Sequence, residues 1–260
     1  MKLLKNIKAF WQREDVQLGY QELKKIAQED PKKFPWWVAT TVSSASSFID
    51  HPILGNQKLN ELGLHEARVK WAAELAERRR AKLAKFLTAE EVAEFKKNGF
   101  ICKENFLPAA EFEALKNELL AKPLPTRETL QGDTVTRRMA LDYRTLPQLP
   151  QTQRLLQSEQ WRNLINYVGS FKVEPMYYVQ VILSHVRKAR PDPQTSLHSD
   201  TFHSSMKAWL FLTDVAEDEG PFVYVPGSHI LNEQRLAWER KRALNINKAD
   251  KMSKRGSFRI

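Results

Sequence analysis

The sequence predicts an α+β fold in which helices come first and clustered strands follow, arranged as a sheet sandwich or jelly roll. Two observations predict it. Apolar side chains recur at helical spacing through residues 64–87, with arginines on the other face. Three apolar runs rich in β-branched and aromatic residues follow after residue 175. With 260 residues, 42% of them hydrophobic, the chain is long enough to bury a sizeable globular core.

The helical part has clear local signals. Two amphipathic segments, Leu3–Trp11 and Val16–Gln28, precede the long helix of residues 64–87. Thr88 and Glu91 form a capping-box pattern that predicts the start of the next helix. Gly99 is predicted to end that helix in the left-handed conformation. Phe100–Lys103 is predicted to be a short strand, and Pro108 is predicted to begin another helix.

The second half is predicted to change from helix to strand. Residues 122–150 contain several prolines and a turn at Gln131–Asp133, which indicate a connecting region. A helix near Ser158–Val168 comes next. The predicted strands are Met176–Leu183, which we expect to be covered on both faces, Lys207–Val215 and Phe222–Val225.

The charge balance invites a nucleic-acid partner, but the pattern does not support one. The chain has 41 basic and 31 acidic residues, a net charge of +10. Basic residues gather at Arg78–Lys85 and between Arg235 and Arg259, in neither case within a recognised nucleic-acid motif. We therefore expect solvated helix faces and no nucleic-acid partner.

Cysteine usage and hydropathy indicate a cytoplasmic protein. Cys102 is the single cysteine, which leaves no intrachain disulfide and no cysteine-based zinc site. No apolar stretch reaches the roughly 18 residues of a membrane span. The first residues lack the apolar core of a secretory signal. We expect no membrane partner.

The candidate chemistry lies in the segment Leu197–His203. On an extended backbone, His198 and Asp200 would point to the same face. Two histidines and one carboxylate on one face of an octahedron are the ligands of non-haem Fe(II) oxygenases, and they leave positions for a 2-oxoacid and O2. A His-x-Asp triplet alone is a weak signal. Its setting, between apolar strands and beside Pro191 and Pro193, strengthens it.

Three motifs occur in order: His198-Ser-Asp200, Lys207-Ala-Trp209, and Gly220-Pro-Phe-Val-Tyr-Val-Pro-Gly-Ser-His229. Together they resemble the phytanoyl-CoA dioxygenase family. The segment Leu87–Phe100 is similar to the helix, glycine and strand with which that family's domain begins. The resemblance covers residues 87–260 and implies a double-stranded β-helix. Residues 1–87 would then be a helical N-terminal extension and residues 88–260 the β-helix domain.

The resemblance implies roles for individual residues. His198 and Asp200 match the first two iron ligands, while Ser199 and Trp209 match positions beside 2-oxoglutarate. For Trp209, a packing role in a strand remains an alternative. His229 matches a structural position. The implied activity is that of an Fe(II)- and 2-oxoglutarate-dependent dioxygenase that hydroxylates a small organic substrate with O2, and it needs no catalytic residue beyond the metal ligands.

The sequence departs from the family in one respect. The family's distal third histidine, and the basic residue that follows it and binds 2-oxoglutarate, are not found. Three explanations stay open: the chain is a fragment with an incomplete β-helix, His203 or His229 completes the site, or the protein is a non-catalytic relative. We favour the explanation that the chain is a fragment. An incomplete β-helix would expose strand edges, and we therefore expect self-association. The rival from another class is a basic binding protein on the same scaffold.

Overall fold

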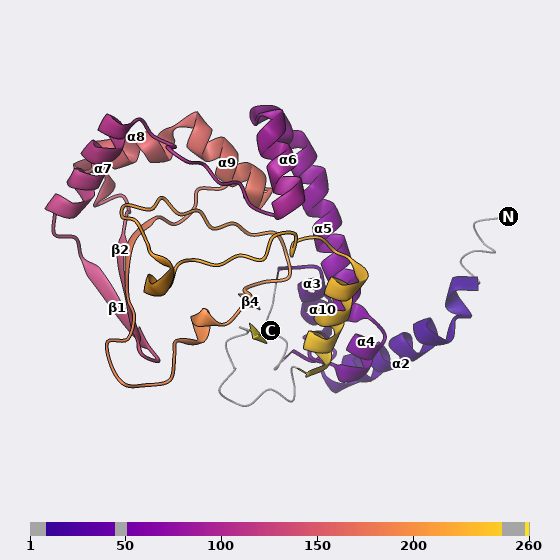
Figure 1. Cartoon of the computed structure of the whole chain (residues 1–260). Coiled ribbons are helices and arrows are strands. Elements are labelled where there is room, and N and C mark those ends of the chain that lie inside the picture. Colours follow the sequence, from indigo (N-terminus) through magenta and orange to yellow (C-terminus); the bar gives the residue numbers. More distant parts are fainter. Residues whose placement is uncertain (1–8, 45–50, 246–257, 260) are drawn as a thin grey trace. The chain divides into compact units, whose positions relative to one another are not determined.

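The structure is a computed structural model that describes residues 9–44, 51–245 and 258–259. It divides into two compact units. Figure 1 shows the helices and strands of the chain, coloured by position in the sequence. Unit 1 contains residues 1–76, 199–204 and 230–259, and unit 2 contains residues 77–198 and 205–229. Among the described residues, no helix combines the length and the apolar character that a membrane span requires.

Unit 1 is built from helices. Its described helices are α2 (Glu14–Glu29), α3 (Phe34–Thr41), α4 (Gln57–Glu61), the first part of α5 (Leu64–Leu83), and α10 (Glu233–Asn245). The predicted helix Val16–Gln28 is confirmed by α2, whereas most of the predicted helix Leu3–Trp11 lies outside the described residues.

The core of unit 1 forms where α2 meets α4. Ile26, Ile53 and Leu59 are buried together there. Asn56 caps α4, because its Oδ1 accepts from the backbone N–H of Leu59 at 2.9 Å. Its Nδ2 donates to Glu22 of α2 at 3.1 Å, so the same side chain also ties α4 to α2.

Unit 2 combines helices with a sheet. Its helices are the remainder of α5, α6 (Ala89–Asn98), α7 (Ala109–Ala121), α8 (Pro150–Gln157) and α9 (Glu159–Gly169). Single 3-10 turns lie at Ala84–Phe86, Leu146–Gln148, Pro193–Thr195 and Glu217–Glu219.

The predicted helix signals of unit 2 are confirmed. Thr88 and Glu91 form both hydrogen bonds of the capping box at the start of α6. Gly99 ends α6 in the left-handed region with φ 84°. Ser158 caps α9, whose bounds agree with the predicted helix near Ser158–Val168.

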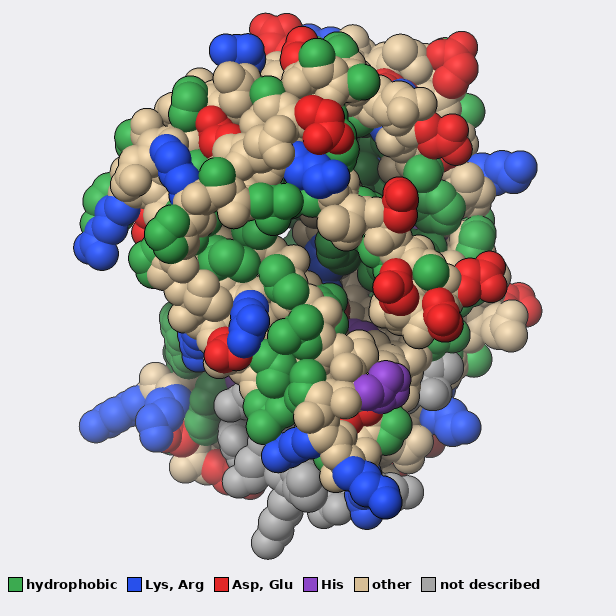
Figure 2. Space-filling model, turned by 60° about the vertical axis from the view of Figure 1, so that its left-hand side comes forward, with side chains coloured by type: hydrophobic (Ala, Val, Ile, Leu, Met, Phe, Trp, Pro, Cys, Tyr) green, Lys and Arg blue, Asp and Glu red, His purple; other side chains and the backbone are tan. Residues whose placement is uncertain are grey.

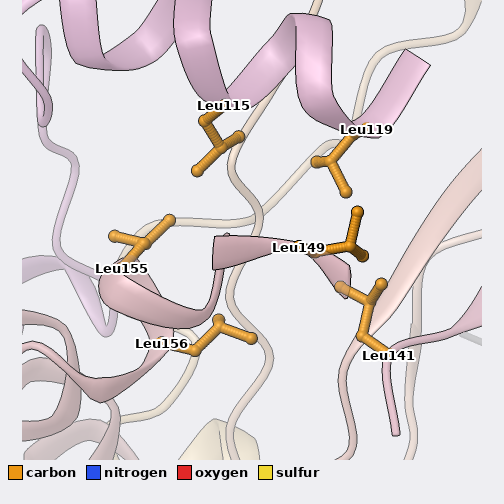
Figure 3. Packing of buried hydrophobic residues seen from close by; sticks show 6 residues of the cluster. All are labelled: Leu115, Leu119, Leu141, Leu149, Leu155 and Leu156. Atoms are coloured by element: carbon orange, nitrogen blue, oxygen red, sulfur yellow. The ribbon is translucent and has the colours of Figure 1, made fainter. Parts of the chain in front are cut away.

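Leucines form the main core of unit 2, at the contact of α7 with α8. The buried side chains labelled in Figure 3 are Leu115, Leu119, Leu141, Leu149, Leu155 and Leu156. Leu149 has no exposed surface. Leu210 and Leu212 pack against this cluster from the segment that was predicted to be the second strand.

The basic residues near the end of α5 are not only a solvated face. Arg79 donates to the carbonyl oxygen of Ser170 at 3.1 Å and stacks on Phe171, 3.9 Å from the ring centroid. Arg80 donates to the carbonyl oxygen of Val168 at 2.9 Å. These carbonyls belong to the last turn and the cap of α9, where helix carbonyls lack intrahelical partners. The prediction that this cluster merely faces water was therefore wrong for Arg79 and Arg80.

The sheet is antiparallel and has three strands in the order β1-β2-β3. Strands β1 (Thr126–Gln131) and β2 (Thr134–Ala140) form a hairpin with Gln131 opposite Thr134, and β2 pairs with β3 (Tyr178–Leu183) with Val135 opposite Leu183. The prediction that residues 122–150 form a connecting region was therefore wrong. The predicted turn at Gln131–Asp133 is nevertheless the turn of this hairpin. A second sheet pairs the two-residue strands β4 (His198–Ser199) and β5 (Phe258–Arg259).

Three further strand predictions need correction. Phe100–Lys103, Lys207–Val215 and Phe222–Val225 contain no strand residues, and Figure 1 draws the last two as loop traces. An apolar run becomes a strand only when a neighbouring backbone pairs with it, and strand propensity does not supply that partner. The alternation within Lys207–Val215 nevertheless persists, since Leu210 and Leu212 pack inward while Trp209 and Phe211 are exposed.

Strand β3 is also more exposed than predicted. We expected it to be covered on both faces, but Tyr178, Val181, Ile182 and Leu183 are exposed. Figure 2 shows hydrophobic side chains, in green, gathered at the surface of the side on which β1 and β2 lie. The described residues thus form a mixed helix-and-sheet fold with an antiparallel sheet.

Candidate functional site

His198 lies on β4 and is partly buried. Its Nδ1 is 2.7 Å from the carbonyl oxygen of Ser196. A carbonyl can only accept, so Nδ1 carries the proton and the lone pair of the neutral ring is on Nε2. Metal-ligating histidines commonly make this bond with the ring nitrogen that faces away from the metal. The ring of His198 is therefore held in the tautomer that presents Nε2 as a ligand atom.

Asp200 follows β4 at a bend, and its side chain is exposed. The strand itself includes only His198 and Ser199. The alternation that was expected to place His198 and Asp200 on the same face therefore ends one residue before Asp200. Ser199 donates its hydroxyl hydrogen to the carbonyl oxygen of Thr201 at 2.9 Å, which stabilises the bend. His198 belongs to unit 2, whereas Ser199 and Asp200 belong to unit 1.

Trp209 lies in the extended segment after this bend. Its ring lies 4.2 Å from that of Phe222, centroid to centroid, at an interplanar angle of 33°. Trp209 is 44% exposed and Phe222 is 52% exposed. Trp209 is therefore not a buried core residue, and part of its ring is exposed.

His203 and His229 were considered as substitute ligands. The Nδ1 of His203 is 3.0 Å from the carbonyl oxygen of Ser204, which also places its lone pair on Nε2. His229 packs against the ring of Phe95, with centroids 5.6 Å apart, and burial lowers its pKa. A Cβ on Gly99 would lie 2.5 Å from Nδ1 of His229, so this imidazole fits closely over the end of α6. The contacts of His229 are those of a packing residue.

A second polar cluster, missed from the sequence, fixes the loop that leads to His198. Asp133 is 6% exposed, and its Oδ2 lies 2.9 Å from Nδ1 of His185. Its Oδ1 accepts from the backbone N–H of Asp192 at 3.1 Å. Burial opposes ionisation of Asp133, but hydrogen bonds from Thr134 and from Asp192 hold its pKa below the ordinary value. The sequence indicated only a turn at Gln131–Asp133. It did not indicate that Asp133 would contact His185 and Asp192.

A family comparison bears on these residues. The family model described as Phytanoyl-CoA dioxygenase (PhyH) matches residues 95–259. The chain belongs to the phytanoyl-CoA dioxygenase family. The predicted resemblance is thereby confirmed, and the matched region includes His198, Ser199, Asp200 and Trp209. Members of this family are in general dioxygenases that use Fe(II) and 2-oxoglutarate. No curated protein and no solved structure matches the chain.

The donor set fits iron only in part. An imidazole with its lone pair on Nε2 and a carboxylate are suitable Fe(II) ligands. Within residues 9–44, 51–245 and 258–259, however, no group of three or more His, Cys, Asp or Glu side chains could hold a metal ion. The described residues thus provide candidate ligands without a complete ligand set.

Proposed function

We propose that the protein is an Fe(II)- and 2-oxoglutarate-dependent dioxygenase that hydroxylates a small organic substrate, with His198 and Asp200 as iron ligands. The observation that carries this proposal is the family match over residues 95–259, which contains the His198-Ser-Asp200 triplet. The orientation of the His198 ring by the carbonyl of Ser196 supports it.

Each residue contributes binding or orientation. His198 would donate the Nε2 lone pair, and the carboxylate of Asp200 would offset part of the charge of the ion. Ser199 and Trp209 would lie against 2-oxoglutarate, Trp209 through its exposed ring. Ser199 would donate its hydroxyl hydrogen to an oxygen of 2-oxoglutarate in place of the carbonyl oxygen of Thr201. Bound Fe(II) would supply the activation of O2, through which 2-oxoglutarate becomes succinate and CO2 and a C–H bond of the substrate becomes C–OH.

The finer fold and domain assignments belong to the same proposal. We propose a double-stranded β-helix for residues 88–260, as the family implies, with residues 1–87 as a helical N-terminal extension. Exposed apolar residues of β3, such as Ile182, support self-association. A cytoplasmic location and an unidentified small-molecule substrate remain predictions.

One argument for the rival function, a basic binding protein on this scaffold, is weakened. This function was motivated by the net charge and by the arginines of α5. Arg79 and Arg80 cap the end of α9 and so have a structural role. Because capping explains these side chains, they do not require a nucleic-acid partner.

The proposed function is tested by anaerobic titration of the chain with Fe(II) and 2-oxoglutarate. We expect a weak charge-transfer absorption for the wild type. His198→Ala should abolish it, because loss of a ligand should weaken metal affinity at least as much as loss of an outer partner, by about 10- to 100-fold. His51→Asn is the matched control, since His51 is a histidine outside the proposed ligand set, and asparagine keeps an acceptor oxygen for the backbone N–H groups of Ile53 and Leu54.

The outcomes separate the two functions. Equal absorption in His198→Ala and in the wild type would remove His198 from the ligand set. No absorption in the wild type, together with nucleic-acid binding that weakens steeply with salt, would replace the enzyme by the binding protein.

A further inference from the structure

The segment that carries Asp200 groups with helices rather than with the three-stranded sheet. Residues 199–204 belong to unit 1, together with α2, α3, α4 and α10. Within this group, Phe202 contacts two residues of α5. Its ring centroid lies 4.4 Å from the guanidinium carbon of Arg68 and 5.6 Å from the ring of His65, which it meets at 67°. Arg68 and His65 are neighbours on the same face of α5 at i and i+3.

Arg68 is fixed by backbone carbonyls. It is 6% exposed, its Nε donates to the carbonyl oxygen of Thr41 at 2.7 Å, and a terminal nitrogen donates to that of Ser43 at 3.2 Å. Thr41 ends α3, where carbonyls lack intrahelical partners. Burial lowers the pKa of Arg68 to about 10, so the guanidinium remains a cation at neutral pH.

His65 is fixed by a buried carboxylate. Its exposure is 1%, and its Nε2 lies 3.0 Å from Oε2 of Glu239, which has no exposed surface. Arg235 binds the other oxygen of Glu239 at 2.8 Å. Burial opposes ionisation of Glu239, but hydrogen bonds from His65 and Arg235 hold its pKa below the ordinary value. Phe202 therefore rests on two side chains that are each held by further partners.

We propose that Phe202 is a positioning residue that holds the Asp200 segment for metal binding by packing on Arg68 and His65. Asp200 lies between two fixed points, strand β4 at Ser199 and the anchor at Phe202. Restricting the backbone on both sides lowers the conformational entropy that Asp200 loses when it binds an ion. The N-terminal helices, predicted to lie outside the oxygenase domain, thereby support one of its ligands. This inference rests on the proposed function.

The test compares Phe202→Ala with Phe202→Tyr in the full chain. The first readout is hydrogen exchange of the backbone amides of residues 199–204 without metal. The second is the dissociation constant for Fe(II) in the presence of 2-oxoglutarate. Phe202→Ala should accelerate the exchange and weaken Fe(II) binding, each by about 10-fold, the effect of losing one desolvated cation–π contact. Phe202→Tyr keeps the ring and should restore both values to within about 2-fold of the wild type.

Two further variants keep the test decisive. Phe86→Ala is the matched control, because Phe86 is an exposed phenylalanine with Lys85 and Lys172 over its ring. It should leave exchange at residues 199–204 unchanged. If Phe202→Ala does not fold, Phe202→Leu keeps apolar volume without the aromatic face, and it should shift both readouts in the same direction.

The failure of each proposal has its own signature. A wild type that binds Fe(II), with a folded Phe202→Ala or Phe202→Leu that matches it in both readouts, would overturn the positioning role. A wild type that binds no Fe(II) would refute the proposed function, whatever the exchange rates are.

Discussion

Replacing Glu239 by glutamine removes the buried negative charge that joins α10 to α5. The carboxylate has no exposed surface and lies 2.8 Å from Arg235, 3.0 Å from His65 and 3.7 Å from Arg242. A glutamine offers one acceptor oxygen and brings an NH2 group against the other donors. Breaking a buried charged network from one side costs about 3–5 kcal/mol, and we expect Glu239→Gln to lose that much free energy of unfolding at pH 7.

The pH dependence gives an independent check on Glu239. Its pKa in the folded chain is below the ordinary value of 4.5. The stability that it contributes is therefore present above pH 4.5 and is lost as the pH falls through the lowered value. The difference between wild type and Glu239→Gln should be largest near neutral pH and should shrink on acidification.

Urea unfolding, followed by far-UV circular dichroism at several pH values, measures both effects. Glu233→Gln is the matched control, because Glu233 lies exposed in the first turn of the same helix and should change stability by less than about 0.5 kcal/mol. A Glu239→Gln chain that is within about 1 kcal/mol of the wild type at pH 7 would refute the network as a source of stability.

Two other substitutions test the packing of unit 2. Leu149→Ala should lower the free energy of unfolding by about 2–5 kcal/mol, because Leu149 is completely buried in the leucine core; a urea midpoint equal to that of the wild type would contradict this. Gly99→Ala should cost more than about 1 kcal/mol, since φ is 84° and the new Cβ would collide with His229. Thermal unfolding measures this loss of stability. An unchanged midpoint would show that His229 moves aside without a cost in free energy.

The helices were predictable because their signals are local. The capping box of Thr88 and Glu91, the left-handed Gly99 and the cap at Ser158 each act within a few residues. The sheet was harder to predict, because pairing joins distant segments. Strand β1 is exposed throughout and has no apolar alternation to reveal it, whereas Lys207–Val215 has the apolar pattern without a paired neighbour.

The sequence predicted the motif of the site, but it did not predict how the side chains of the site are positioned. The family assignment follows from His198-Ser-Asp200 and the motifs after it, and the family match confirms it. The anchor at Phe202 depends on contacts with residues more than 100 positions away in the sequence. No spacing rule connects Phe202 with Arg68, so this contact could not be inferred from the chain alone.

The exposed apolar strand β3 affects how copies of the chain would behave in solution. Among the described residues, β3 pairs with β2 alone, so its other edge presents backbone donors and acceptors beside Ile182 and Leu183. A net charge of +10 repels one copy from another and delays contact between such edges. Salt shortens the range of that repulsion to about 8 Å at physiological ionic strength and leaves the hydrophobic attraction in place. If copies of the chain associate along β3, as we propose, higher ionic strength should favour the associated form.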